Sequence, residues 1–179
     1  MLSSLDLSLL EALYAGNLSP PWVYLIIAVT FLGSGWMMIG LLPALFIRGW
    51  RVPSAVALIM LAVVSAVVAG VKVIAGRVRP CQALTWAHAL PLSMPTDCSF
   101  PSGHAAGSFA FAAFVLTLNR RAGAIVLLIA VLVGLSRIAL GVHYPSDVLA
   151  GAMLGSAVGW ASARSYALRR DRYDARLAA

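Results

Sequence analysis

Residues 53–80 read PSAVALIMLAVVSAVVAGVKVIAGRVRP, an apolar run that closes with three cations. About 20 apolar residues cross the hydrocarbon core of a bilayer, so the run predicts a membrane span over Pro53–Ala75. A charge within a span costs roughly 2.5–3.5 kcal/mol. Lys72, Arg77 and Arg79 therefore either snorkel to the headgroups or serve a function.

Composition extends this prediction to the whole chain. Of 179 residues, 61% are hydrophobic and 11% are charged, with a mean hydropathy of +0.92, which is typical of integral membrane proteins. We expect an all-α polytopic transmembrane bundle of five helices in a single domain. The expected spans are Trp22–Ile47, Pro53–Ala75, Ser102–Leu118, Gly123–Leu140 and Ser146–Ala163.

The ends of the chain differ from the bundle at 19–163. Residues 1–18 carry Asp6 and Glu11 among leucines and predict an amphipathic helix lying on the membrane surface. For Trp22–Ile47, one long tilted helix is preferred to a hairpin at Gly33, because each half would be too short to span. Residues 164–179 form a basic tail that would touch anionic lipid, and the net charge of +7 does not indicate nucleic acid.

Arginines near the span ends predict the orientation. Nine of them fall on one side under this topology: Arg48, Arg51, Arg120, Arg121, Arg164, Arg169, Arg170, Arg172 and Arg176. The positive-inside rule makes that side the cytoplasm. For a bacterial inner membrane, residues 76–101 and 137–146 would then face the periplasm or the exterior.

Spacing separates the three cations. Lys72 and Arg79 lie within about 20° of each other around a helix, whereas Arg77 lies about 140° from Lys72. Lys72 and Arg79 can therefore hold one anion, and Pro80 would end the helix at Arg79. Arg77 is expected to contact headgroups or the lip of the site.

Two further segments fall on the same predicted membrane face. In FPSGHAAG, residues 100–107, Ser102 can cap a helix, Gly103 admits a ligand to the backbone, and His104 stands in the first turn. In SRIALGVHYPSD, residues 136–147, Asp147 follows His143 by four residues and can orient its imidazole. The alternatives are a capped helix with an interfacial histidine, and an Asp147 that only caps its own helix.

Together these residues resemble the three-part signature of the type 2 phosphatidic acid phosphatase family. The matching positions are Lys72, Arg79 and Pro80, then Pro101, Ser102, Gly103 and His104, then Ser136, Arg137, His143 and Asp147. One departure is the surface helix, which replaces the first of six spans found in many such enzymes.

The resemblance implies a membrane lipid phosphatase. His143 would be the phosphoryl-accepting nucleophile, Asp147 would orient it, and His104 would protonate the leaving oxygen. The phosphoryl oxygens would be bound by three cations and by a helix terminus. The cations are Lys72, Arg79 and Arg137, and the terminus is formed by Ser102 and Gly103. Six acidic residues in all offer no cluster for a divalent ion, so we expect no metal and no cofactor.

Cys81 and Cys98 bracket the outer loop, where a disulfide between them is expected in preference to two unrelated small side chains. The expected substrate is a membrane lipid phosphate, with undecaprenyl diphosphate first. Phosphatidylglycerophosphate, phosphatidic acid and lipid A phosphates are alternatives, as is phosphotransfer to another lipid. A vanadium haloperoxidase or a lipid-binding protein without turnover would be different classes. The residues leave the oligomeric state undetermined.

Overall fold

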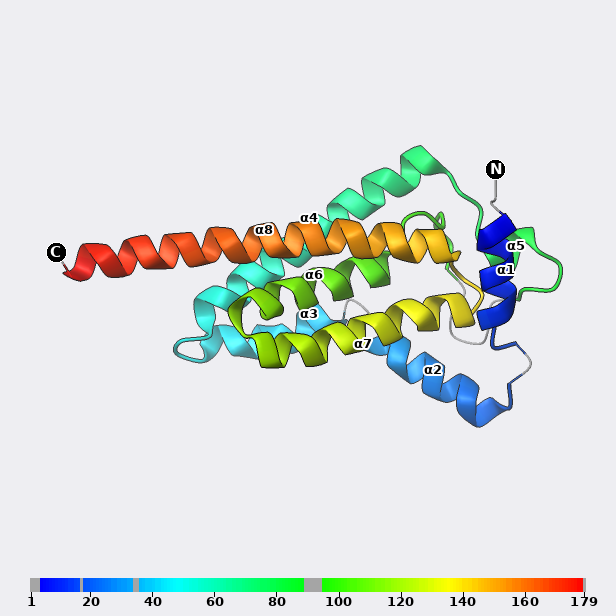
Figure 1. Cartoon of the computed structure of the whole chain (residues 1–179), viewed down its shortest axis with the longest axis horizontal. Coiled ribbons are helices and arrows are strands. Elements are labelled where there is room, and N and C mark those ends of the chain that lie inside the picture. Colours follow the sequence, from blue (N-terminus) through cyan, green and yellow to red (C-terminus); the bar gives the residue numbers. More distant parts are fainter. Residues whose placement is uncertain (1–3, 17, 34–35, 89–94, 179) are drawn as a thin grey trace.

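The computed structural model describes residues 4–16, 18–33, 36–88 and 95–178 of the chain. All regular secondary structure in these ranges is helical, which confirms the predicted all-α class (Figure 1). The elements are α1 Ser4–Leu13, α2 Pro20–Leu32, α3 Trp36–Leu41, the 3₁₀ helix η1 Leu42–Phe46, α4 Arg51–Ala75, α5 Pro80–Ala83, α6 Gly103–Leu118, α7 Arg120–Ala139 and α8 Pro145–Ala178.

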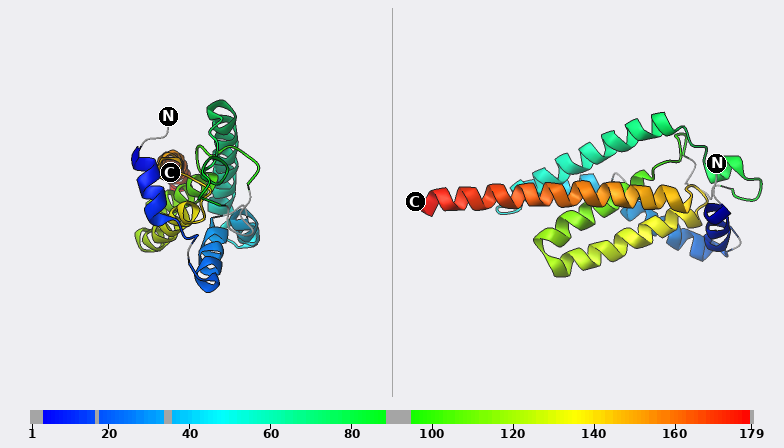
Figure 2. Two further views of the ribbon diagram at one scale, coloured as in Figure 1. Left: turned by 90° about the vertical axis from the view of Figure 1, so that its right-hand side faces the viewer. Right: turned by 45° about the horizontal axis from the view of Figure 1, so that its top comes forward.

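Four long helices, α4, α6, α7 and α8, run along the length of the molecule (Figures 1 and 2). Helix α6 contacts the other three, and α2 packs against α7. The C-terminal ends of α4 and α7 meet the N-terminal ends of α6 and α8 at one end of the bundle, beside α1 and α5. The three motif segments, near Lys72, His104 and His143, therefore lie at the same end of the bundle. The C-terminus lies at the opposite end.

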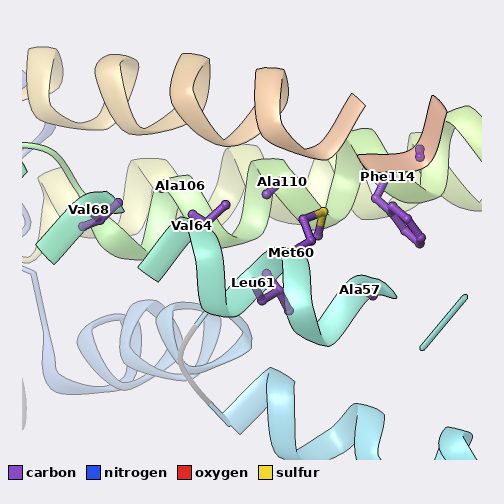
Figure 3. Close-up of a cluster of buried hydrophobic side chains, with 9 residues drawn as sticks. Ala57, Met60, Leu61, Val64, Val68, Ala106, Ala110 and Phe114 are labelled. Atoms are coloured by element: carbon purple, nitrogen blue, oxygen red, sulfur yellow. The ribbon is translucent and has the colours of Figure 1, made fainter. Parts of the chain in front are cut away.

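The main hydrophobic core joins α4 to α6 and α8 (Figure 3). Its buried members are Ala57, Met60, Leu61, Val64, Val68, Ala106, Ala110, Phe114 and Ala163. The α4 residues recur every three or four positions and so form one stripe along the helix. Alanines on α6 face this stripe, which lets the two helices approach closely.

The outer surface of the bundle is apolar and part of its interior is polar. On α4, Val73 and Ile74 are 83% and 87% exposed, whereas the neighbouring Lys72 is only 9% exposed. This reverses the pattern of soluble proteins and suits a chain that is solvated by lipid. Among the described residues, 51–83 and 120–139 are long and apolar enough to cross a bilayer, and α2 and α6 are shorter apolar helices.

Three glycines on α8 allow it to lie directly on the backbone of α6. A Cβ atom added at Gly151, Gly155 or Gly159 would collide with a backbone carbonyl of α6. The sequence repeat of these glycines therefore serves close helix packing. The N-terminal end of α8 is fixed against α6 by a hydrogen bond from the Ser102 amide to the Asp147 carbonyl, 3.0 Å long.

The prediction of one continuous helix over Trp22–Ile47 is wrong. Helix α2 ends at Leu32, and the chain continues onward in the same general direction as α3 and η1 rather than as a hairpin (Figure 1). Gly33 fits so tightly against Val133 and Ser108 that no side chain could stand there. Pro43 then removes a backbone donor from the segment that becomes η1.

Two other boundaries also differ from expectation. The surface helix ends earlier than the predicted residue 18, because α1 ends at Leu13. Helix α8 continues through the basic tail to Ala178, well beyond the span end expected at Ala163. The tail is therefore a helical extension of the bundle.

Candidate active site

The three segments singled out in the sequence converge on one cavity of about 340 Å³ at the α1 end of the bundle. It is lined by residues of α4, α6 and α7, by Gly33 after α2, and by the three loops that carry Arg79, Asp97 and His143. Its polar and charged lining consists of Lys72, Arg79, Asp97, His104, Arg137 and His143, together with Ser65. We call this cavity the anion pocket, because cations dominate its wall.

Lys72 and Arg79 both form ion pairs with the carboxylate of Asp97 in the anion pocket. The Lys72 ammonium lies 2.8 Å from Asp97 Oδ2, and Arg79 Nη2 lies 2.7 Å from Asp97 Oδ1. Burial would raise the pKa of the Asp97 carboxyl, but hydrogen bonds from the two cations lower it to about 2. The pocket thus holds an anion of the protein itself between two cations, and the Asp97 side chain is 56% exposed at its mouth.

The path of the chain between these two cations differs from the expected helix. Helix α4 ends at Ala75, and Gly76 takes a left-handed conformation with φ of 54°. Arg79 is the extended N-cap residue of α5, with Pro80 at the first helical position. The two cations converge as expected, but a loop rather than one helix face brings them together.

His143 has a different charged partner at each ring nitrogen. Arg79 Nη1 lies 3.0 Å from Nε2, and Asp147 Oδ2 lies 3.5 Å from Nδ1. A guanidinium can only donate, so Nε2 must be the acceptor and the ring proton belongs on Nδ1, facing Asp147. At 3.5 Å that contact is long for a hydrogen bond, and it orients the ring mainly through charge.

Burial, together with the charges of Arg79 and Arg137, lowers the pKa of the His143 imidazole to about 4, although Asp147 opposes the shift. His143 is 2% exposed. The imidazole is therefore neutral at pH 7, with a lone pair on Nε2 that is directed at Arg79 and the pocket. A neutral imidazole is the form that can act as a nucleophile.

Asp147 both caps its helix and faces His143. The two alternatives that the sequence left open, a helix cap and a partner of His143, are therefore both correct. It is the third helical residue after the cap, and its Oδ2 accepts from the Tyr144 amide at 2.9 Å. The Ser99 hydroxyl donates to the same oxygen, and Arg77 Nη1 donates to Oδ1. The side chain is fully buried, so these partners hold it in one orientation.

The α6 terminus presents free backbone to the same cavity. Ser102 is the N-cap, as predicted, and its hydroxyl accepts from the Ala105 amide at 3.4 Å. Gly103 and His104 both line the anion pocket. Only Val68 comes within 4 Å of a Cβ placed at Gly103, so packing does not demand glycine there. Its absent side chain instead leaves the helix terminus open to a ligand.

Arg137 reaches the pocket from the last turn of α7. It is 5% exposed, and its Nη1 donates to the Thr30 hydroxyl of α2 at 2.9 Å. Its Nε has no hydrogen-bond partner among the described residues. A buried guanidinium with spare donors is suited to bind an incoming anion.

Arg77 corrects one expectation. It does not extend to headgroups, because its guanidinium forms ion pairs with Asp6 at 2.7 Å and with Asp147. The same group lies 4.2 Å from the centre of the Tyr144 ring. Arg77 lies in the loop after α4 and does not line the anion pocket, and it contacts the carboxylate behind His143.

The predicted disulfide is not formed, since Cys81 and Cys98 are both free thiols. Cys81 packs against the cluster of Ile27, Leu140 and Val142, and its amide donates to the Gly141 carbonyl at 3.1 Å. The Cys98 carbonyl instead accepts from Lys72 and Arg79. Each cysteine is fixed by its own neighbours.

Sequence reasoning missed several polar partners of the site. They are Asp6, Thr30, Asp97 and Ser99. A usable signal was the scarcity of acids: the chain has six, and Asp6, Asp97 and Asp147 all lie at this end. In an apolar protein, acids on the same face as a set of cations are candidate partners of those cations.

This chain is similar in sequence and in fold to several known proteins. The profile of the PAP2 superfamily matches residues 53–171. The chain is 38% identical over 130 residues to decaprenylphosphoryl-5-phosphoribose phosphatase of Mycobacterium tuberculosis, covering 70% of this chain and 68% of the relative. It is 36% identical over 90 residues to undecaprenyl-diphosphatase BcrC of Bacillus subtilis, covering 49% and 47%. The fold resembles the crystal structure of Aquifex aeolicus LpxE with a TM-score of 0.78 and 30% identity, covering 90% and 96% of the two chains.

Proposed function

Because the chain belongs to the PAP2 superfamily of membrane lipid phosphatases, we propose that it removes the terminal phosphate from a polyprenyl-linked lipid, with undecaprenyl diphosphate as the first candidate. The reaction consumes one water and yields inorganic phosphate and the shortened lipid. It proceeds through a phosphohistidine on His143. Lys72, Arg79 and Arg137, with Ser102 and the Gly103 amide, bind the transferred group.

The observation that carries this proposal is the carboxylate of Asp97 between Lys72 and Arg79. A carboxylate and a phosphoryl group both offer oxygen acceptors to the same donors. The bound position of Asp97 therefore marks where phosphoryl oxygens bind when substrate displaces it. Arg79 also contacts His143 Nε2 at 3.0 Å, so a group held by Arg79 lies beside the nucleophile.

The first chemical step is attack of His143 Nε2 on phosphorus. As substrate oxygens engage Arg79, its Nη1 releases the Nε2 lone pair, the phosphorus–nitrogen bond forms, and the bond to the leaving oxygen breaks. His104 donates a proton to that oxygen. The positive charge that develops on the imidazole is stabilised by Asp147 behind Nδ1.

The second step returns the enzyme to its starting state. Water attacks the phosphohistidine and gives its proton to His104, the phosphorus–nitrogen bond breaks, and inorganic phosphate leaves. Cations at fixed positions stabilise the equatorial oxygens in both steps, which is the main requirement of phosphoryl transfer. We propose that they make the reaction independent of divalent metal.

The walls of the pocket suit a lipid. Its lining continues along α4 through Ala69, Val68 and Ser65 to Leu61. Leu61 lies eleven residues before Lys72, which corresponds to roughly 16 Å along a helix axis. An apolar chain can lie against this wall while its headgroup reaches Lys72. The positive-inside pattern would place the headgroup end at the periplasmic or outer face.

A second candidate substrate, decaprenylphosphoryl-5-phosphoribose, is supported by sequence similarity to a mycobacterial enzyme. Decaprenylphosphoryl-5-phosphoribose, named in the Mycobacterium tuberculosis relative, carries a terminal phosphate on a sugar instead of on a phosphate. That relative matches more of this chain than undecaprenyl-diphosphatase BcrC does. The two substrates share the polyprenyl tail and the terminal phosphate, and they differ in the leaving group that His104 would protonate.

The test is phosphate release by purified protein in detergent with excess EDTA. Substrates are undecaprenyl diphosphate, decaprenylphosphoryl-5-phosphoribose, phosphatidylglycerophosphate, phosphatidic acid and lipid A. We expect a polyprenyl lipid to have the highest kcat/KM, and His143→Gln to abolish release. Loss of activity in EDTA that Mg²⁺ restores would refute metal independence, and preference for a glycerolipid or lipid A would refute the substrate class.

A further inference from the structure

We infer that Asp6, on the N-terminal helix α1, is a positioning residue for the His143–Asp147 pair and acts through Arg77. This inference rests on the proposed function, since it concerns the orientation of the proposed nucleophile. Asp6 lies 137 residues before His143 in sequence, and α1 resembles a surface helix with no part in chemistry. The contacts show a more direct connection.

Arg77 links two carboxylates. Its Nη2 donates to Asp6 Oδ2 at 2.7 Å, and its Nη1 donates to Asp147 Oδ1. Asp147 Oδ2 is the oxygen that faces His143 Nδ1. One unbroken chain of charged contacts therefore runs from α1 to the nucleophile.

Ser146 closes this chain into a compact network. Its hydroxyl accepts from Arg77 Nη1 at 2.7 Å and donates to Asp6 Oδ2 at 2.6 Å. Its amide donates to Asp6 Oδ1 at 2.9 Å. Asp6 thereby caps the first turn of α8, the turn that carries Asp147, although it belongs to another helix.

Apolar contacts hold α1 in the position that these bonds require. Leu10 is fully buried with Tyr144 and Ile138. The Ala15 amide also donates to the Ala139 carbonyl at 2.9 Å, just beyond the end of α1. Helix α1 is thus packed against the segment that contains His143, beside the start of α8 (Figure 1).

The charges in the network explain why Asp6 matters to the nucleophile. Burial would raise the pKa of the Asp6 carboxyl, but hydrogen bonds from Ser146 and Arg77 hold it below its usual range. Asp6 is therefore ionised, and the positive charge of Arg77 is balanced by two carboxylates, those of Asp6 and Asp147. Without it, Arg77 would be paired with Asp147 alone, and less negative charge would remain to stabilise the positive phosphohistidine.

The experiment compares Asp6→Asn with Glu11→Gln, which removes an exposed acid from the same helix. By analogy with the loss of carboxylate partners behind metal-bound histidines, we expect Asp6→Asn to lower kcat by about tenfold, with KM changed less than about twofold. Glu11→Gln should leave both constants as in the wild type. Asp6→Glu, which retains the charge, should recover part of kcat.

A double-mutant cycle separates positioning from a merely structural role. If Asp6 acts through Arg77, adding Asp6→Asn to Arg77→Gln should cause little further loss of kcat. Equal losses in both backgrounds, or an unchanged kcat in Asp6→Asn, would overturn the inference. Should Asp6→Asn fail to fold, Arg77→Lys keeps the positive charge but loses the fork that contacts both carboxylates, and a wild-type kcat in that variant would equally overturn it. Phosphate release by the wild type and its loss in His143→Gln test the proposed function separately.

Discussion

His143 is held at both ring nitrogens by groups of opposite charge, and this arrangement fixes its state before substrate arrives. Arg79 requires a lone pair on Nε2, and Asp147 favours the proton on Nδ1. Burial excludes water from the ring. The same side chain is thus neutral and aimed at the anion pocket, which is the starting state that attack on phosphorus needs.

The titration of His143 provides a direct check at this scale. Its pKa of about 4 is well below the usual value near 6.5. The imidazole signal of His143, followed by NMR of isotope-labelled histidine and assigned with His143→Gln, should not shift between pH 7.5 and pH 5.5. A midpoint near 6.5 would contradict the account. Because the unfolded chain binds this proton near pH 6.5 and the folded chain only near pH 4, stability falls as the pH is lowered through this window, so folding is monitored at each pH.

Removing the charge of Asp97 should strengthen substrate binding, whereas removing an ordinary binding residue weakens it. The Asp97 carboxylate is paired with Lys72 and Arg79, so under the proposed function it would compete with the substrate phosphate. Asp97→Asn should lower KM by about fivefold, because the pocket no longer has to release an anion before binding one. Steady-state kinetics measure this change, and Asp97→Glu, which keeps the charge, is the control. A higher KM in Asp97→Asn would show that Asp97 instead builds the pocket.

Some of these residues could be predicted from sequence and others could not. Asp147 follows His143 by four residues at a helix start, so local geometry brings them together. Asp97 and Asp6 meet their partners only after the helices pack, and no periodicity in the sequence encodes such contacts. The same holds for Arg77, which the sequence predicts at the headgroups or at the lip of the site, because its two carboxylate partners come from distant segments.

At the scale of the elements, the apolar pattern predicted the helices better than their interruptions. The runs over α4, α6 and α7 gave their positions to within a few residues. At the break after α2, Gly33 packs tightly against side chains of α6 and α7, a tertiary contact that the apolar pattern does not encode. The four-residue glycine repeat of α8 did indicate close packing, because small residues along one helix face are useful only against a neighbour.

The α6–α8 contact yields a stability prediction. Gly155→Ala puts a methyl group into the Ala106 carbonyl and should destabilise the fold by roughly 1–3 kcal/mol. Gly70→Ala on α4 is the matched control, because nothing lies within 4 Å of its Cβ position and alanine favours a helix. Thermal unfolding in detergent measures both. Equal melting temperatures for the two variants would contradict the packing.

At the scale of the molecule, the anion pocket and the basic tail lie at opposite ends of the bundle. The anion pocket and α1 occupy one end, and the basic part of α8 occupies the other (Figure 1). The sequence anticipated this separation because the motifs and the arginine-rich loops alternate along the chain. Membrane orientation, however, follows from the positive-inside rule and is a separate prediction.

Labelling in intact cells tests that orientation. In a chain with Cys81→Ser and Cys98→Ser, a single thiol is introduced by Glu11→Cys on α1 or by Arg169→Cys on the tail, both exposed positions. A membrane-impermeant maleimide should label Glu11→Cys in intact cells and Arg169→Cys only after permeabilisation. The reverse pattern would place the anion pocket on the cytoplasmic side.

The most direct measurement is capture of the phosphoryl enzyme. Protein mixed with a lipid carrying a labelled terminal phosphate is quenched within a turnover, kept alkaline and digested, and the labelled peptide is sequenced by mass spectrometry. The account predicts an acid-labile, base-stable label on His143 that is absent in His143→Gln. A label on any other residue, or undiminished phosphate release by His143→Gln, would contradict it.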